Sequence, residues 1–472
     1  MNPGTTKTGK LIATVGVVLL LAGCILGPDY KRPVVESPEK YRFAPAEAEA
    51  LVNLKWWELF KDPVLYSLVT TALTNNRDLW VAASRIEEAR AFLGFTRADL
   101  YPRIDLDAGA NKGNFFGGSR SSTTNTALYV APVLNWEVDF WGKFRRSNET
   151  ARAELFASAY ALRTVQLSLV AEVVSAYYLL LDFHHRLEIS RSTLNSRIKS
   201  LDIIQERFKG GIIPELDVNQ AQIQKEIAAA AIPSYERSIA QTENILSILL
   251  GGHSRQIETG MDLNRQPIPP DIPTGLPADL LERRPDIIES LYYLEAQNAR
   301  IGFAEALRFP AITLTGALGL ASTELGGITT EGGVWSVGGG LLGPIFNYGK
   351  NIRRVEIEEE RTQQALYRFE NTVLKAFGEV EDALVEIQTY DRQIKSVNNK
   401  LTAAKNADKL ARERYDAGFT SFLETLDAER TLFSIELEYS QLKRQYLNAY
   451  VKLYKALGGG WLTKAEMGAT DS

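Results

Sequence analysis

Cysteine and histidine are scarce in this sequence, and their scarcity excludes several classes of protein. The 472 residues contain one cysteine, Cys24, so an intramolecular disulfide cannot form. The three histidines, His184, His185 and His253, have no acidic or cysteine partners at the spacing of metal ligands. No phosphate-binding glycine loop and no nucleophile motif occurs in a suitable context. We therefore expect no metal, no cofactor and no catalytic residues, so that the protein is not an enzyme.

An excess of basic residues is also absent. Lysine and arginine number 53 against 58 aspartates and glutamates, which gives a formal net charge of -5 at pH 7. Nucleic acid is thereby excluded as the main partner, because no surplus of positive charge exists to neutralise phosphates. Charged residues make up 24% and hydrophobic residues 45% of the chain. This is the composition of an ordinary folded protein, neither disordered nor wholly buried in a membrane.

The N-terminus has the layout of a lipoprotein signal peptide. Residues 1–10 include two lysines and no acid, and an apolar run over 11–23 ends at Cys24. We interpret residues 1–23 as the signal peptide, because the run is too short to span a membrane comfortably. Leu21-Ala22-Gly23-Cys24 resembles a bacterial lipobox, in which the cysteine is lipidated. Ile25 stands where aspartate would retain a lipoprotein in the inner membrane, so the outer membrane is favoured. An uncleaved anchor with a chance cysteine is the alternative.

The chain contains two copies of one structural unit. Three blocks recur in the same order at a nearly constant offset, namely 86–106 with 294–314, 132–136 with 344–348, and 205–216 with 412–423. A proline-rich linker over 264–278 separates the copies. We therefore predict the following divisions: a lipidated N-terminal segment over 24–62, a first repeat over 63–263, a second repeat over 279–460, and a tail over 461–472.

Each repeat is predicted to contain a very long helix. Apolar residues recur at alternating spacings of three and four from Phe369 to Ala404, which is typical of a left-handed coiled coil. The helix should run from about residue 351 to about 415 and measure roughly 100 Å, with a counterpart over 144–208. No compact domain accommodates two such helices, so we expect an elongated bundle or tube. The apolar stretch 165–183 is interpreted as a buried part of the long helix over 144–208, because it contains Glu172 and continues into charged sequence on both sides. A transmembrane helix is the alternative.

Short alternating segments follow Pro102 and Pro310. Apolar residues alternate there with polar ones, as in Ile104, Asp105, Leu106 and Asp107. Return strands are expected near 126–135 and 334–343. Alternation over about ten residues is typical of transmembrane β-strands, although a half-buried soluble sheet is an alternative. Four strands cannot close a barrel, and open sheet edges are not tolerated in lipid. If these strands span a membrane, three chains must therefore share one barrel of twelve strands.

A series of motifs occurs in order along almost the whole mature chain. The motifs are Gly27–Tyr30, Trp56-Trp57, Trp136–Gly142, Leu281–Asp286, Glu379–Leu384, Leu426–Ala428 and Leu453–Trp461. Together they resemble the TolC/OprM outer-membrane factor family, and most closely its lipidated, NodT-like branch, which serves drug and metal efflux pumps.

This resemblance implies a membrane protein of mixed α and β structure. A homotrimer would form a twelve-stranded β-barrel in the outer membrane, continuous with an α-helical barrel in the periplasm. The lipid-anchored trimer would connect a periplasmic adaptor and an inner-membrane pump to the exterior. It would thus be the exit duct of a tripartite efflux system for small molecules such as drugs or metal ions. A channel for type I protein or peptide secretion, and a lipid-tethered coiled-coil scaffold, are the alternatives. The cargo and the class of pump are not determined by the sequence.

The predicted helix-tip turns contain the candidate functional residues. Gly211 and Gly418 should each end a long helix in a left-handed cap, at the end opposite the strands. The resemblance implies that Glu424 and Asp427 line the periplasmic mouth of the tunnel. Three-fold symmetry would make each a ring of carboxylates, which draws cations. A purely local role in the first turn of a helix, favoured by the helix dipole, is the alternative.

Two further residues match a gate lock in the family. The resemblance implies that Asp217 and Tyr415 hold the closed state through hydrogen bonds between helices. Thr420 stands where the arginine of that lock would be, so the lock is not present in its usual form. Which residues keep the gate closed is therefore left open by the sequence.

Overall fold

The computed structural model of the chain describes residues 24–43, 60–116, 119–269, 277–323 and 333–459. The expected signal peptide, Trp56-Trp57, part of the proline-rich linker and the C-terminal tail lie outside these residues. The chain forms two compact units, and each contains segments of both repeats. Unit 1 takes in the chain up to Val34, 84–159 and 289–370, whereas unit 2 takes in 35–83, 160–288 and the chain from Asn371.

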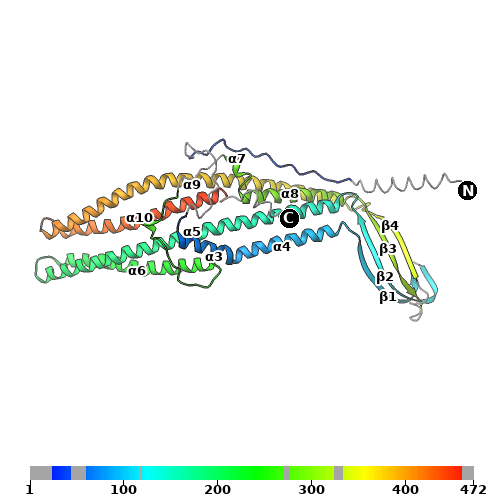
Figure 1. Ribbon diagram of the computed structural model, residues 1–472, viewed down its shortest axis with the longest axis horizontal. Helices are drawn as coiled ribbons and strands as arrows, with labels where there is room; N and C mark the ends of the chain where they lie inside the picture. The colour runs from blue at the N-terminus through cyan, green and yellow to red at the C-terminus, as the bar shows by residue number, and fades with distance from the viewer. Residues whose placement is uncertain (1–23, 44–59, 117–118, 270–276, 324–332, 460–472) are drawn as a thin grey trace. The chain divides into compact units, whose positions relative to one another are not determined.

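Unit 1 contains one antiparallel sheet of four strands in the order β1-β2-β3-β4 (Figure 1). The strands are β1 (Arg103–Phe116), β2 (Ser119–Val138), β3 (Ala311–Ser322) and β4 (Gly333–Leu342). Each repeat therefore contributes one hairpin, as predicted, and the return strand of the first hairpin is longer than expected. Within the described part of the chain, β1 and β4 each pair along one side only. The sheet thus ends in two open edges.

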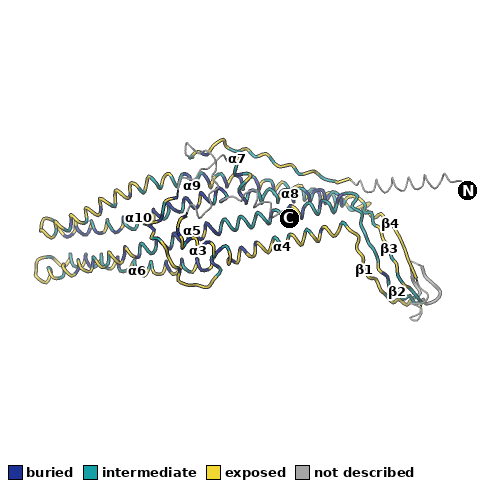
Figure 2. Tube along the Cα trace, in the orientation of Figure 1, coloured by how far each residue is buried: buried dark blue, intermediate teal, exposed yellow. Residues whose placement is uncertain are grey.

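The two faces of this sheet differ in polarity. Cross-strand partners share a face, and the register aligns Ile104 with Leu134, Leu134 with Gly316, and Gly316 with Val337. The same face carries the apolar residues Leu106, Trp136, Leu314, Leu318, Trp335 and Leu341. The opposite face carries the polar residues Asp105, Asp107, Thr313, Thr315 and Ser336. Every residue of β4 is exposed, with 82% of Val337 and 76% of Trp335 accessible (Figure 2). An apolar face left this open needs an apolar environment.

Four helices of unit 1 follow the same order as the strands. They are α4 (Arg77–Ala98), α5 (Lys143–Lys209), α8 (Pro285–Ala306) and α9 (Lys350–Asp416), and all four extend into unit 2. Side-chain amides and hydroxyls join neighbours: Asn148 donates to the carbonyl of Thr96 (3.1 Å), Thr150 to that of Ala296 (3.4 Å), and Asn351 to that of Leu307 (2.7 Å). The resulting order is α4-α5-α8-α9. Within the described residues, α4 and α9 are therefore the two ends of this order.

Unit 2 contains the main hydrophobic core. Helices α3 (Pro63–Asn75), α6 (Glu215–Leu249) and α10 (Phe422–Ala456) pack there against the middle of α5, next to the short helices η1 (Leu263–Arg265) and α7 (Pro277–Leu280). Val173, Val174 and Leu180 of α5 are completely buried. Helix α5 is apolar and long enough to cross a membrane, and half of its apolar window is buried inside the protein. These contacts agree with the interpretation of 165–183 as a buried helical stretch.

The predicted coiled-coil seam is confirmed. Helices α5 and α9 begin and end within one residue of the expected limits. Phe369, Val373, Ala376 and Val380 are each at most 2% exposed. Further along, Val397 and Ala404 of α9 pack against Ile435 and Leu442 of α10. Residues three and four apart lie on one side of a helix, so their apolar side chains form a continuous stripe.

Candidate functional site

The long helices α5 and α9 end in the same kind of turn. Gly211 and Gly418 have φ angles of 69° and 79°, in the left-handed region. The amide of Gly211 donates to the carbonyl of Phe208, and the next amide donates to that of Arg207; the same two bonds recur around Gly418. This is the Schellman pattern, which satisfies the last carbonyls of a helix. The duplication thus gives two helical hairpins, α5–α6 and α9–α10, with matching tips.

An apolar cluster joins the two tips. Leu201 and Ile204 of α5, Ala221 of α6, and Phe422 and Leu426 of α10 are buried against one another. Tyr415 of α9 is partly buried in the same cluster, with its ring centroid 5.3 Å from that of Phe422. Movement of one tip relative to the other would therefore expose apolar surface.

Glu424 and Asp427 lie on the solvent-exposed face of α10. Phe422, Thr425 and Leu426 occupy the buried face, and the two acids, one turn apart, point away from it. Glu424 accepts a hydrogen bond from the hydroxyl of Thr420. Arg414 lies 3.8 Å from Glu424, and Arg430 lies 2.5 Å from Asp427, all at exposed positions. Both carboxylates are therefore available to solvent and to ions at the tip.

Asp217 and Tyr415 both lie at the tips but are not hydrogen-bonded to each other in the described structure. Asp217 is in the first turn of α6, and the next residue, Val218, packs in the cluster that contains Tyr415. The Tyr415 ring instead forms a cation–π contact with Arg207 of α5, whose guanidinium carbon is 4.7 Å from the ring centroid. Arg207 also forms an ion pair with Asp416 (3.1 Å). An arginine thus contacts the tyrosine from the other long helix, although Thr420 occupies the expected arginine position.

A partly buried ionic cluster lies further from the tips and was not anticipated from the sequence. Arg412 of α9 is 2.9 Å from Glu429 of α10 and 3.1 Å from Asp408, and it donates to the hydroxyl of Ser196 on α5. Burial raises the pKa of Glu429, and the charge of Arg412 partly opposes this shift. Arg197 of α5 donates to the carbonyl of Gln224 on α6 at 2.5 Å. This cluster ties both hairpins together.

One sequence signal could have indicated this ionic cluster. Glu429 stands between Leu426 and Phe433, three and four residues away, so it occupies a position of the buried stripe of α10. Arg197 precedes the buried Leu201 by four residues in the same way. Charged residues at buried helical positions are almost always paired, so the sequence indicates that Glu429 and Arg197 each have a polar partner.

Apolar side chains are exposed at the extreme end of both tips. Ile212 and Phe419 follow the two glycines and are 74% and 78% exposed. Leu216 and Leu423, at matching positions of the two repeats, are each 62% exposed. Among the described residues, no group of three or more histidine, cysteine or acidic side chains could hold a metal ion. The tips therefore present carboxylates and apolar side chains, which suit contact with ions and with another protein.

The sequence was compared with protein families and with known proteins. Residues 68–252 and 276–459 match the outer membrane efflux protein family. The chain is 34% identical over 464 residues to the probable outer membrane lipoprotein SilC of Salmonella typhimurium, covering 96% of this chain and 99% of that protein. The chain belongs to the outer membrane efflux protein family. Another member, the solvent efflux pump outer membrane protein SrpC of Pseudomonas putida, is 36% identical over 461 residues, with 94% of this chain and 97% of SrpC covered.

Solved structures of outer-membrane channels share the fold of this efflux protein. The outer-membrane channel OprN is 30% identical, with a TM-score of 0.86 and coverage of 93% of this chain and all of that chain. The CmeC channel of Campylobacter jejuni is 26% identical, with a TM-score of 0.87 and coverage of 95% and 98%. The predicted family, fold class and outer-membrane location are thereby confirmed.

Substitution of the tip glycine tests the role of the turn. Gly418→Ala should lower the free energy of unfolding by about 1–2 kcal/mol, because an alanine side chain crowds the backbone in the left-handed region. Gly378→Ala is the matched control on the same helix α9, where an added Cβ meets no atom within 4 Å. This change should instead raise stability by about 0.5–1 kcal/mol, since glycine weakens a helix interior. Denaturant titration followed by circular dichroism measures both values, and a stabilising Gly418→Ala would contradict the cap.

Proposed function

We propose that this protein forms, as a homotrimer, the exit duct of a tripartite efflux system, and that it is not an enzyme. The observation that carries the proposal is the four-stranded sheet, with one exposed apolar face and two edges that pair with no other described strand. Unpaired backbone groups are not tolerated in lipid, so such a sheet must continue into further copies of itself. Identical copies would pair β4 of one chain with β1 of the next. Three copies of four strands would give the twelve-stranded barrel.

The helices support the same closure. The helical order α4-α5-α8-α9 of unit 1 ends at α4 and α9, which directly precede β1 and follow β4. An arrangement that joins β4 to the next β1 would therefore also bring α9 beside the next α4. The barrel and the helical tunnel would then close through the same interface, repeated by rotational symmetry between all copies.

The N-terminal segment supports a lipid anchor at Cys24. The cysteine is exposed, and the amide of Leu26 two residues later donates to the carbonyl of Trp141 at 3.2 Å. Arg146 further holds this segment through the carbonyls of Leu26 and Gly27, each at 3.0 Å. A lipid on Cys24 would thus leave the protein near the position where the sheet begins. The anchor and the barrel would then insert into the same membrane.

The tips of the hairpins are the proposed periplasmic mouth of the duct. Ile212 and Phe419 with their neighbours form the exposed apolar contact for a periplasmic adaptor protein, which connects to an inner-membrane pump. Glu424 and Asp427 would form rings of three carboxylates, and Asp217 and Tyr415 would contribute to the closed state. One relative is named for solvent efflux and another, CusC of Escherichia coli, for cation efflux. We therefore propose that the pump, rather than the duct, selects the cargo.

Single-channel recording in planar bilayers tests this proposal. The purified protein should form channels that prefer cations, whereas a coiled-coil scaffold would form none. Glu424→Ala with Asp427→Ala should remove most of the cation preference, because six carboxylates would leave the mouth of a trimer. Glu258→Ala with Asp262→Ala is the control, since it removes the same charge from exposed positions beyond the far end of α6. If the tip variant and the control have the same conductance and the same cation preference, Glu424 and Asp427 do not line the mouth of the channel.

A further inference from the structure

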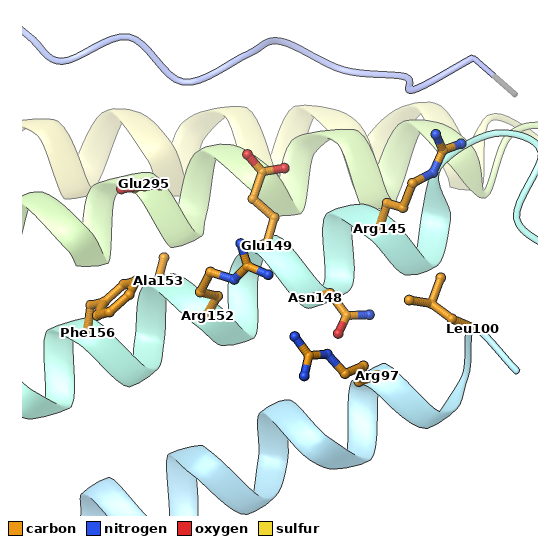
Figure 3. Close-up of a pocket in the computed structure, with 9 residues that line it drawn as sticks. All are labelled: Arg97, Leu100, Arg145, Asn148, Glu149, Arg152, Ala153, Phe156 and Glu295. Atoms are coloured by element: carbon orange, nitrogen blue, oxygen red, sulfur yellow. The ribbon is translucent and has the colours of Figure 1, made fainter. Parts of the chain in front are cut away.

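A cavity of about 550 Å³ lies in unit 1 between α4, α5 and α8. Its charged and amide lining consists of Arg97, Arg145, Arg152, Asn148, Glu149 and Glu295. Arg97 and Asn148 point toward one another from facing helices, and Arg152 extends from the next turn of α5 (Figure 3). Leu100 and Phe156 add apolar surface. The cavity thus offers groups of both charge signs and an apolar wall.

Some of these charged groups are already paired within the chain. Arg145 lies 3.0 Å from Asp139, and Glu149 lies 2.8 Å from Arg146. In contrast, the guanidinium groups of Arg97 and Arg152 form no hydrogen bond or ion pair with any residue that the structure describes. The carboxylate of Glu295 also has no such partner among the described residues. Two cations and one anion therefore face this cavity without partners.

The position of the cavity indicates where its ligand would come from. Arg146, whose side chain is 3% exposed, links Glu149 of the cavity to Asp29 in the segment after Cys24. Burial, together with the charge of the nearby Glu295, raises the pKa of Tyr30 to about 12. The carbonyl of Leu100 accepts a hydrogen bond from the indole of Trp136 on β2. The cavity therefore adjoins both the proposed anchor segment and the end of the sheet.

We propose that this cavity binds the zwitterionic headgroup of a phospholipid such as phosphatidylethanolamine. Its phosphate would contact Arg97 and Arg152, because planar guanidinium groups match the oxygen atoms of a phosphate. Its ammonium would contact Glu295. Burial and the charge of Glu149 raise the pKa of Glu295, and a neighbouring cation would oppose this shift by favouring the charged carboxylate. The inference rests on the outer-membrane location, but not on the proposed duct activity.

Native mass spectrometry of the full-length protein in detergent tests the site. The probes are phosphatidylethanolamine, phosphatidylglycerol, which has no ammonium group, and soluble phosphoethanolamine. The wild type should retain phosphatidylethanolamine in preference to the other two. Arg97→Gln with Arg152→Gln should weaken this binding about tenfold, since each change removes a charge-assisted contact. Arg85→Gln with Arg90→Gln, exposed on the same helix α4, should leave binding unchanged. Glu295→Gln should reduce the preference for phosphatidylethanolamine over phosphatidylglycerol.

Each of the following results would overturn the inference. Equal lipid binding by the cavity variant and the α4 control would show that Arg97 and Arg152 do not form the site. Equal affinity for soluble phosphoethanolamine would assign the cavity to a free solute. Loss of the oligomer in the cavity variant alone would mean that a carboxylate of a neighbouring copy fills the cavity. Conductance is recorded on the same preparations, so channels without lipid preference would contradict this inference while leaving the proposed function intact.

Discussion

Arginine in place of Val337 should prevent most of the protein from assembling in the outer membrane. Val337 lies in the middle of β4 on the apolar face and is 82% exposed. A charged side chain on the lipid face of a barrel costs about 2–4 kcal/mol near the bilayer midplane. Three-fold symmetry would repeat this cost in each copy, for a total of about 6–12 kcal/mol per trimer. Heat-resistant oligomers in outer-membrane fractions, measured by unheated gel electrophoresis, should therefore nearly disappear.

The neighbouring residue provides a matched control. Ser336 pairs with Ala317 and lies on the polar face of the same strand, because successive residues of a strand point to opposite faces. Ser336→Arg introduces the same side chain one position away, and the oligomer should persist with altered conductance. Equal loss of oligomers in both variants would contradict a lipid-facing apolar side. Loss in Ser336→Arg alone would invert the assignment of the two faces.

Features that depend on a local signal in the sequence, such as helical periodicity, a proline or a glycine, were predicted well. The seam from Phe369 to Ala404 depends on spacings of three and four, and burial of those residues follows directly from helical geometry. Pro102 and Pro310 marked the beginnings of two strands, since proline ends a helix and is tolerated at the start of a strand. Gly211 and Gly418 marked the tips, because few other residues adopt a left-handed cap.

Contacts between distant segments were not predicted. The sequence contains no local sign that Arg197 approaches Gln224, or that Arg412 approaches Ser196 across 216 positions. Such pairs depend on the register and rotation of two packed helices, which local periodicity does not determine. The order of the strands and the mixing of both repeats in each compact unit have the same origin. For the same reason, the sequence did not predict that the arginine in contact with Tyr415 would be Arg207 of α5 and not a residue after Gly418.

Three of the motifs that mark the family meet at one buried arginine. Arg284 precedes α8, and its side chain is 7% exposed. Its Nε atom lies 2.8 Å from an oxygen of Asp286, and one Nη atom lies 2.5 Å from Glu379 on α9. The other Nη atom donates to the carbonyl of Ala456 at the end of α10 (3.1 Å). One guanidinium therefore holds the start of the second repeat, the seam helix and the C-terminal helix together within unit 2.

Arg284→Met should lower the free energy of unfolding by about 2–3 kcal/mol, because it removes a buried guanidinium and leaves the carbonyl of Ala456 without its donor, whereas Asp286 and Glu379 stay accessible to water. Arg284→Lys should have an intermediate effect, since an ammonium cannot reproduce the planar fork that contacts three partners. Arg265→Met is the control: its side chain is 81% exposed and lies 3.8 Å from Asp262, so stability should barely change. Chemical denaturation in detergent gives all three values. If Arg284→Met is as stable as the Arg265→Met control, packing and not the guanidinium joins the three motifs.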